Sequence, residues 1–419
     1  MKACILTLGC KVNEAESASL LAGLEARGWE TADSPCAADL YIINTCAVTA
    51  EAEKKSRQAV ARLRKFNPQA PVLVCGCASQ NAPEAFASRE GVTLVTGTMR
   101  KDRIPELLGE KGIFLQTETA FCELPAPKRT HTRANLRIQD GCDRFCSYCL
   151  IPYLRGRSRS RSMESVHAEA TACGAREIVL TGIDITSYRD GENDLGDLLL
   201  SLKDVPARIR LGSLEEGIVS REFLEKMKKA GNVCEHFHLS LQSGSDNVLR
   251  AMNRRYTREQ YLQACALIGE FFPDAAITTD IIVGFPTETE EDFMQSLRIV
   301  GEAGLARVHA FPYSCLLYTS EPRQHCRKSH CQCEHQRRQT APASRFREAG
   351  AHGPHARPRE RGGGGLFVPV RIADAHCPVR ERRRVYVQLY PRLCGERKGR
   401  GHVRGHAPGT LPRRVACQN

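Results

Sequence analysis

Apolar and polar positions alternate along the first 100 residues in a pattern that predicts strands and helices in turn. Short apolar runs occur at "ACILTLGC", "DLYIINTC" and "APVLVCGC". Between them, "EAESASLLAGLEARG" and "TAEAEKKSRQAVARLRKF" repeat apolar residues at helical spacing. Strands that alternate with helices indicate a parallel sheet covered by helices. We therefore predict an α/β amino-terminal domain over residues 1–110.

A second series of strand-like runs follows the segment 111–132, which has neither pattern and is predicted to be a linker. The runs are "LRIQDGC", "EIVLTGID", "ARIRLGSL", "HFHLSLQSG", "AITTDIIVGFP" and "ARVHAFPYS". Helical segments such as "REFLEKMKKAG" and "TREQYLQACALIGEFF" separate most of them. Six such units without a dinucleotide-binding fingerprint favour a partial (βα)6 barrel over residues 133–314. Its active site would lie at the carboxyl ends of the strands.

Both periodic patterns stop after Ser314. Residues 315–419 carry 22 Lys and Arg against 7 Asp and Glu, whereas residues 1–314 carry 38 against 41. The net charge of +12 therefore belongs to this aberrant basic tail. Two interpretations are open: a basic arm, or a stretch that is frameshifted or chimeric. We draw no function from it.

Cysteine is abundant, with 20 residues in the chain. No apolar run approaches the roughly 20 residues of a membrane span, and the first residues do not resemble a signal peptide. We therefore expect a cytoplasmic protein without a membrane partner. Because the cytosol keeps thiols reduced, clustered cysteines there indicate metal binding or redox chemistry and not disulfides.

Three cysteines, Cys142, Cys146 and Cys149, have C-x3-C-x2-C spacing on a loop after a predicted strand. Three thiolates on such a loop can bind three irons of a cubic [4Fe–4S] cluster, which leaves the fourth iron open to a small molecule. A structural zinc site normally has four protein ligands, and no fourth ligand is evident in the sequence. The spacing thus favours an iron–sulfur cluster, with zinc as the alternative.

The motif "CDRFCSYC" resembles the cluster motif of the radical S-adenosylmethionine superfamily, and residues 1–314 resemble a methylthiotransferase. The resemblance implies that the open iron binds S-adenosylmethionine, whose reductive cleavage gives a 5′-deoxyadenosyl radical. It also implies that Tyr148 lies near the adenine and that Gly182 approaches the methionine end of the cofactor. The alternatives are a packing aromatic and a strand-end turn.

Four polar residues stand at predicted strand ends that face the mouth of the barrel. Hydrogen bonds from such positions can hold the cofactor or the target base, although each residue can equally be an ordinary structural polar group. They lie in segments that resemble the methylthiotransferase signature. These candidate cofactor-binding residues are Ser213, Glu215, Ser240 and Gln242.

Each of the three strands predicted in the amino-terminal domain ends in a cysteine: Cys10, Cys46 and Cys77. The carboxyl ends of parallel strands share one edge, so we expect these thiols to converge. An isolated cysteine at such a position would more often be a small packing residue. The resemblance implies that this trio holds a second [4Fe–4S] cluster and acts in sulfur insertion, and its motif selects Cys77 over the neighbouring Cys75.

Four arginines alternate with small residues directly after the cluster motif, at Arg155, Arg157, Arg159 and Arg161. On an extended segment they would face one side, and guanidinium groups bind phosphate in bidentate fashion. The alternatives are a solvated charge run or internal ion pairs. Because the family's substrates are mostly tRNA, the resemblance favours contact with the phosphate backbone.

The first cysteine motif, "GCKVNEAES", is most similar to the branch that modifies N6-threonylcarbamoyladenosine 37 of tRNA. The other branches act on isopentenyladenosine 37 or on an aspartate of a ribosomal protein. The implied reaction adds a methylthio group to C2 of the base, with flavodoxin or ferredoxin as electron donor and an unknown sulfur donor. The family's carboxy-terminal β-barrel domain is expected but not recognisable here. An alternative of another class is a non-catalytic iron–sulfur or zinc RNA-binding protein.

Overall fold

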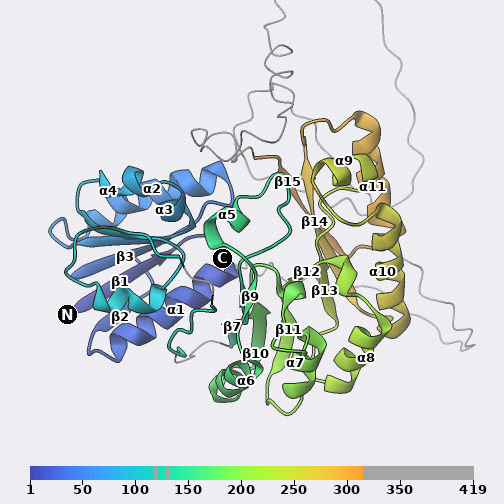
Figure 1. Ribbon diagram of the computed structural model, residues 1–419, viewed down its shortest axis with the longest axis horizontal. Coiled ribbons are helices and arrows are strands. Elements are labelled where there is room, and N and C mark those ends of the chain that lie inside the picture. The colour runs from blue at the N-terminus through green and yellow to red at the C-terminus, as the bar shows by residue number, and fades with distance from the viewer. Residues whose placement is uncertain (118–119, 128–131, 315–419) are drawn as a thin grey trace, which may run out of the picture.

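The computed structural model describes residues 1–117, 120–127 and 132–314 (Figure 1). It is an α/β structure in which a parallel sheet from the amino-terminal third lies beside a curved row of parallel strands from the rest. Helix α1 contacts β7 and helix α3 contacts α5, so the two parts touch directly. The tail, 315–419, and the β-barrel domain expected there lie outside the described residues.

The amino-terminal sheet has six strands that are all parallel. In spatial order they are β2 (Glu30–Ala32), β1 (Lys2–Thr7), β3 (Leu40–Thr45), β4 (Val72–Gly76), β5 (Val92–Thr96) and β6 (Gly112–Phe114). Its helices are α1 (Lys11–Glu25), α2 (Ala50–Arg64), α3 (Cys77–Asn81), α4 (Pro83–Ala87) and the 3-10 helix η1 (Lys101–Glu106). The strand order reverses between β1 and β3, which is where ligands bind in open α/β sheets.

Strand β3 shows why this sheet is buried on both faces. All six of its residues are buried. Tyr41 and Ile43 pack with Ala59, Val60 and Leu63 of α2 on one face. Ile42 packs with Leu20 and Leu24 of α1 on the other. A continuous apolar run such as "LYIINT" is the pattern expected for a strand covered on both sides.

The second part contains the row of strands predicted to form a partial barrel. One sheet has the order β11 (Arg208–Leu211), β10 (Glu177–Thr181) and β7 (Arg133–Arg137). The other has the order β12 (Ser213–Leu214), β13 (His236–Leu239), β14 (Ala276–Val283) and β15 (Arg307–Pro312). Only Gly212 separates β11 from β12, and its N–H donates to the carbonyl of Leu180 on β10 at 3.0 Å. The two sheets are therefore one curved parallel row with six strand positions, as predicted.

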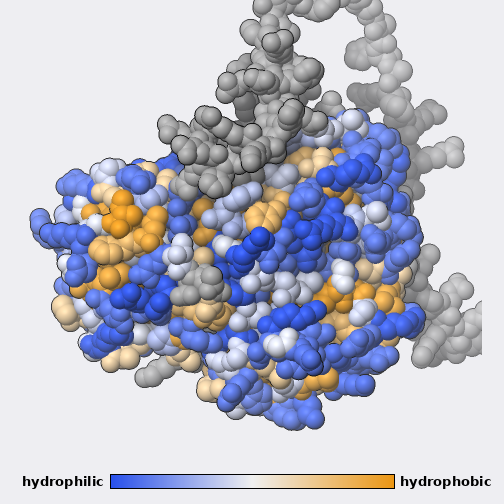
Figure 2. Space-filling view, viewed as in Figure 1, coloured by the Kyte–Doolittle hydropathy of each residue, from blue (hydrophilic) through white to orange (hydrophobic). Residues whose placement is uncertain are grey.

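Helices cover the outside of this row (Figure 1). They are α6 (Met163–Ala172), α7 (Leu195–Ser201), α8 (Arg221–Ala230), α9 (Asp246–Ala251), α10 (Arg258–Phe271) and α11 (Glu290–Glu302). The short helix α5 (Ile151–Arg155) lies instead between the row and the amino-terminal sheet, where it contacts α3. This part also contains the 3-10 helices η2 (Ile185–Ser187) and η3 (Glu216–Ile218). Capping boxes begin α10 at Thr257 and α11 at Thr289. Figure 2 shows mainly hydrophilic side chains on the visible face, since the apolar faces of these helices point inward.

The strands predicted from the sequence are present, but the structure has further strands that were not predicted. We did not predict β2, β5 or β6 from the sequence. Strand β6 lies inside the predicted linker, 111–132, and pairs with β5 at the edge of the amino-terminal sheet. The antiparallel pair β8 (Gln139–Asp140) and β9 (Arg159–Ser160) was also not expected. In the described residues, no helix is long and apolar enough to cross a membrane.

Candidate active site

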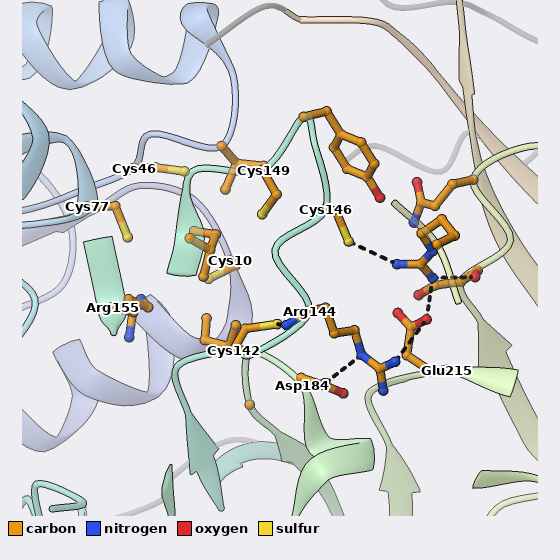
Figure 3. Close-up of a pocket in the computed structure, with 18 of the residues that line it drawn as sticks. Cys10, Cys46, Cys77, Cys142, Arg144, Cys146, Cys149, Arg155, Asp184 and Glu215 are labelled. Atoms are coloured by element: carbon orange, nitrogen blue, oxygen red, sulfur yellow. Dashed lines mark hydrogen bonds and ion pairs between the residues drawn. The ribbon is translucent and has the colours of Figure 1, made fainter. Parts of the chain in front are cut away.

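Six cysteines from both parts of the chain line one cavity of about 270 Å³ (Figure 3). Three of them belong to the C-x3-C-x2-C motif and the other three follow separate strands of the amino-terminal domain, and each trio was predicted to bind a cluster. The structure brings them together at the carboxyl ends of the amino-terminal sheet and of the curved row. The six are Cys10, Cys46, Cys77, Cys142, Cys146 and Cys149.

The amino-terminal trio follows three adjacent strands but does not lie within them. Cys10 is the residue before α1, Cys46 directly follows β3, and Cys77 is the first residue of α3. Cys10 and Cys46 therefore stand on either side of the point where the strand order reverses. Cys75 lies within β4, is fully buried in the core on the α1 side and does not line the cavity.

Two glycines allow the turns that carry the amino-terminal cysteines to approach each other closely. Gly9 has φ 102°, and a Cβ there would lie 2.7 Å from Sγ of Cys46. Gly76 has φ 103°, and a Cβ there would lie 2.5 Å from the carbonyl oxygen of Thr45. Any side chain at these positions would push the cysteine-bearing turns apart.

The second trio lies on the loop that joins β8 to α5. The Cys142 N–H donates to the carbonyl of Gly156 at 3.1 Å, and the Cys149 N–H donates to the carbonyl of Cys146 at 3.0 Å. At the outer edge of the loop, Asn253 Nδ2 donates to the carbonyl of Phe145 at 2.9 Å. The short β8–β9 pairing closes the base of this loop. The loop is thus held at both ends and at its outer edge.

Burial keeps most of these thiols protonated. It raises the pKa of Cys46 and Cys142 to about 11 and that of Cys149 to about 12, and it raises the pKa of Cys77. A thiol nucleophile needs a lowered pKa, so this environment does not favour nucleophilic catalysis. Metal ligation remains compatible with it, because a bound metal displaces the proton.

The arrangement of donors fits a cluster. Within the described residues, no group of three or more His, Cys, Asp or Glu converges closely enough to hold a single metal ion. A cubic cluster does not require such convergence, because each thiolate binds a different iron. Three thiols in each trio would leave one iron of each cluster without a protein ligand.

Five of the six predicted cofactor-binding residues line the same cavity: Tyr148, Gly182, Glu215, Ser240 and Gln242. Ser213 does not line it and is exposed. At Gly182 a Cβ would lie 2.8 Å from Ile185 and 2.9 Å from Gln139 Oε1, so local packing alone accounts for the glycine. The backbone of Gln242 has φ 65° and is held by Asp280 and Ile282 of β14, which fixes the direction of its side chain.

Sequence reasoning missed three charged residues in the cavity wall. Arg254 Nη1 lies 3.4 Å from Sγ of Cys146, and the same guanidinium pairs with Glu215. Arg144 Nε donates to Asp184 Oδ2 at 2.7 Å. The Glu215 pKa is raised, because burial outweighs the attraction of Arg254 and Arg144. The doubled arginine in "MNRRYT" was the one sequence signal for Arg254.

Three of the four arginines predicted to bind phosphate are buried, which corrects that prediction. Arg155 is fully buried and pairs with Glu16 and Asp140. Arg159 pairs with Asp140, and Arg161 pairs with Glu123 and Glu169. The extended geometry assumed for the segment is wrong at its start, because residues 151–155 form helix α5. Arg157 alone is exposed, with 76% of its side chain accessible.

Comparisons with known proteins match both parts of the chain. Residues 136–300 match the Radical SAM superfamily, and residues 2–97 match the uncharacterized protein family UPF0004. The threonylcarbamoyladenosine tRNA methylthiotransferase MtaB of Chlamydia pneumoniae is 39% identical over 74% of each chain. The chain belongs to the radical S-adenosylmethionine methylthiotransferase family. Its cofactors therefore include an iron–sulfur cluster and S-adenosylmethionine.

Relatives from two branches of this family have similar identities. MtaB of Bacillus subtilis (strain 168) is 36% identical over 74% of this chain and 72% of its own. The tRNA-2-methylthio-N(6)-dimethylallyladenosine synthase of Alkaliphilus oremlandii is 39% identical over 74% of this chain and 70% of its own. Among solved structures, the apo cobalamin-dependent radical enzyme OxsB aligns with a TM-score of 0.52 at 14% identity, over 72% of this chain and 51% of its own. That likeness supports the fold alone.

Proposed function

We propose that this chain is a tRNA methylthiotransferase that adds a methylthio group to C2 of N6-threonylcarbamoyladenosine 37. The observation that carries the proposal is the single cavity lined by both cysteine trios. A reaction that inserts sulfur at an unreactive carbon needs a radical source and a sulfur source within reach of one substrate atom. Two cluster sites that face one cavity meet that need.

In the proposal, Cys142, Cys146 and Cys149 hold the cluster that binds S-adenosylmethionine, and Cys10, Cys46 and Cys77 hold a second [4Fe–4S] cluster. When bound, the first cluster would supply an electron, one S-adenosylmethionine the methyl group and a second the carbon radical, while the sulfur would be held at the second cluster. The protein supplies binding, orientation and exclusion of water. An electron donor such as flavodoxin or ferredoxin and a sulfur donor of unknown identity complete the reaction.

The charged wall of the cavity suits the polar ends of S-adenosylmethionine. The Arg254–Glu215 and Arg144–Asp184 pairs offer both a cation and an anion next to the second trio. Tyr148 is partly buried beside the second trio, and its ring offers a flat apolar surface for the adenine. Gln242 and Ser240 also line the cavity, and Arg254 donates to the carbonyl of Ser240 at 3.1 Å, so polar groups for hydrogen bonds to the cofactor lie beside the Arg254–Glu215 pair.

The experiment is mass spectrometry of tRNA nucleosides from a host that lacks its own enzymes of this family, with and without the gene. We expect 2-methylthio-N6-threonylcarbamoyladenosine to appear with the gene. The dimethylallyl product in its place would assign the other tRNA branch, and modified ribosomal protein would assign the third. If no product forms and the purified chain does not cleave S-adenosylmethionine, the non-catalytic RNA-binding alternative replaces the proposal.

A further inference from the structure

Arg155 is a buried junction between the two parts of the chain. None of its side chain is exposed. Its Nη1 donates to Glu16 Oε1 and to Asp140 Oδ1, both at 2.9 Å. Its Nη2 donates to Asn13 Oδ1 at 2.9 Å and to Glu16 Oε2 at 3.2 Å. Four of the five N–H bonds of a guanidinium group are therefore occupied by protein acceptors.

The fifth N–H, on Nε, is buried without a hydrogen-bond partner. A buried donor left unpaired is costly, so such a group in a folded protein calls for an explanation. Arg155 also lines the cavity beside Cys10, Cys46 and Cys77 (Figure 3). The unused donor thus belongs to a side chain that lines the cavity together with the amino-terminal cysteines.

The ion pairs around Arg155 carry an excess of positive charge. Glu16 pairs with Lys101, Arg137 and Arg155, and Asp140 pairs with Arg137, Arg155 and Arg159. Among the described residues of this network, four cations face two carboxylates, and all six side chains are buried. Buried charge without compensation is strongly unfavourable. Anionic sulfur at the neighbouring trio would supply the missing negative charge.

We infer that Arg155 Nε–H donates a hydrogen bond to an anionic sulfur atom held at the Cys10–Cys46–Cys77 site. The inference rests on the proposed function, which places a second cluster there. Hydrogen bonds to cluster sulfur and nearby positive charge favour the reduced state, which carries one more negative charge. Arg155 is then a positioning residue that raises the reduction potential of the amino-terminal cluster, and it does not bind phosphate.

The test uses the full chain with Cys142, Cys146 and Cys149 replaced by alanine, so that only the amino-terminal cluster can form. Arg155→Gln removes the charge and the Nε donor, whereas Arg155→Lys keeps the charge alone. Both should fold, because Glu16 retains Lys101 and Arg137 while Asp140 retains Arg137 and Arg159. Arg159→Gln is the matched control: its Nε is also buried without a partner, but it does not line the cavity.

The measurements on each reconstituted protein are iron content, midpoint potential, and the deuterium sensitivity of Fe–S stretching bands in resonance Raman spectra. We expect four irons to be retained, a lower midpoint in R155Q, and a smaller decrease in R155K. The deuterium-sensitive shift should be lost in both variants and kept in R159Q. An unchanged midpoint in R155Q with full iron, or an equal decrease in R159Q, overturns the inference. A parent protein that binds no cluster overturns the two-cluster proposal as well.

Discussion

Nη1 of Arg155 lies 2.9 Å from Oε1 of Glu16, although 139 positions separate the two residues in the chain. Glu16 belongs to α1 of the amino-terminal sheet, and Arg155 ends α5 beside the second cysteine loop. This contact fixes the helix that follows Cys10 against the helix that follows Cys149. The ion pair therefore sets how the two cysteine trios face each other.

Glu16→Gln should destabilise the protein by roughly 3–5 kcal/mol, the usual cost of removing one partner from a buried ion pair. The reason is that Glu16 is fully buried against three cations, Lys101, Arg137 and Arg155. Denaturant unfolding followed by circular dichroism measures the loss. Glu30→Gln is the control, since its pair with Lys2 is exposed and should contribute less than about 1 kcal/mol. Equal losses in the two variants would contradict this account.

Replacing Cys10, Cys46 and Cys77 together with alanine should abolish methylthiolation while reductive cleavage of S-adenosylmethionine continues. The second trio lies on a separate loop with its own hydrogen bonds, so its cluster does not depend on the first. Iron should fall from roughly eight to roughly four per chain, given four irons per cluster. Cys75→Ala is the control, because Cys75 lies in the core away from the cavity and should keep the full iron content. Product formation by the triple variant would remove the sulfur-insertion role from this trio.

The positions of the cysteines could be predicted because they follow from short-range patterns. A buried parallel strand is an uninterrupted apolar run, and its end is visible in the sequence where the run stops. Cys46 and Cys77 follow such runs directly, and adjacent strands then bring them together. Strands β2 and β6 were missed, since a run of three residues lacks a periodic signal.

The role of the arginines could not be predicted, because their partners are remote. Nothing near Arg155 in the sequence indicates Glu16. Alternation with small residues predicts an extended segment, but the chain forms a helical turn that ends at Gly156 with φ 72°. The sequence contains the charges but not the pairing that buries three of them. A run of charged residues in a sequence therefore does not by itself show that these residues are exposed on the protein surface.

Arg254→Gln should reduce the rate of S-adenosylmethionine cleavage by roughly 10–100-fold, the usual cost of removing a group that supports a metal ligand. Arg254 contacts Sγ of Cys146 at 3.4 Å and pairs with the buried Glu215. Loss of its charge leaves Glu215 without its nearest partner at the cofactor site. Methionine and 5′-deoxyadenosine formation measure the rate, and iron analysis checks that the cluster is retained. Arg250→Gln, at an exposed position on α9, should leave the rate unchanged. Full activity in R254Q would exclude this role.

Protein stability should depend on pH through Glu177. Hydrogen bonds from Arg210 and Arg208 lower the Glu177 pKa from its ordinary value of 4.5 to about 2. A lowered carboxyl pKa stabilises the folded state above pH 4.5, and this contribution is lost as pH falls toward 2. The free energy of unfolding of the parent protein should exceed that of the Glu177→Gln variant by roughly 3 kcal/mol at neutral pH. This difference should shrink below about pH 4.5. Urea unfolding across pH 3 to 7 measures it. A difference that does not vary with pH would show that Glu177 stabilises the fold by packing instead.

Arg157→Gln should weaken tRNA binding and reduce its salt dependence. Arg157 is the one arginine of residues 155–161 that stays exposed, and its guanidinium lies 5.1 Å from the ring centre of Phe145 on the cluster loop. Its ion pair with Asp143 is exposed too and should yield readily to a phosphate. Loss of one phosphate contact lowers the slope of log K against log salt by about 0.7–0.9. Filter binding of the full chain to tRNA at several salt concentrations measures the slope.

Arg176→Gln is the control. It changes an exposed arginine just before β10, at the opposite end of the strand from the cavity, and should leave the slope unaltered. Equal slopes for parent and R157Q would mean that Arg157 makes no phosphate contact, and that the predicted phosphate-binding segment does not bind tRNA through any of its four arginines.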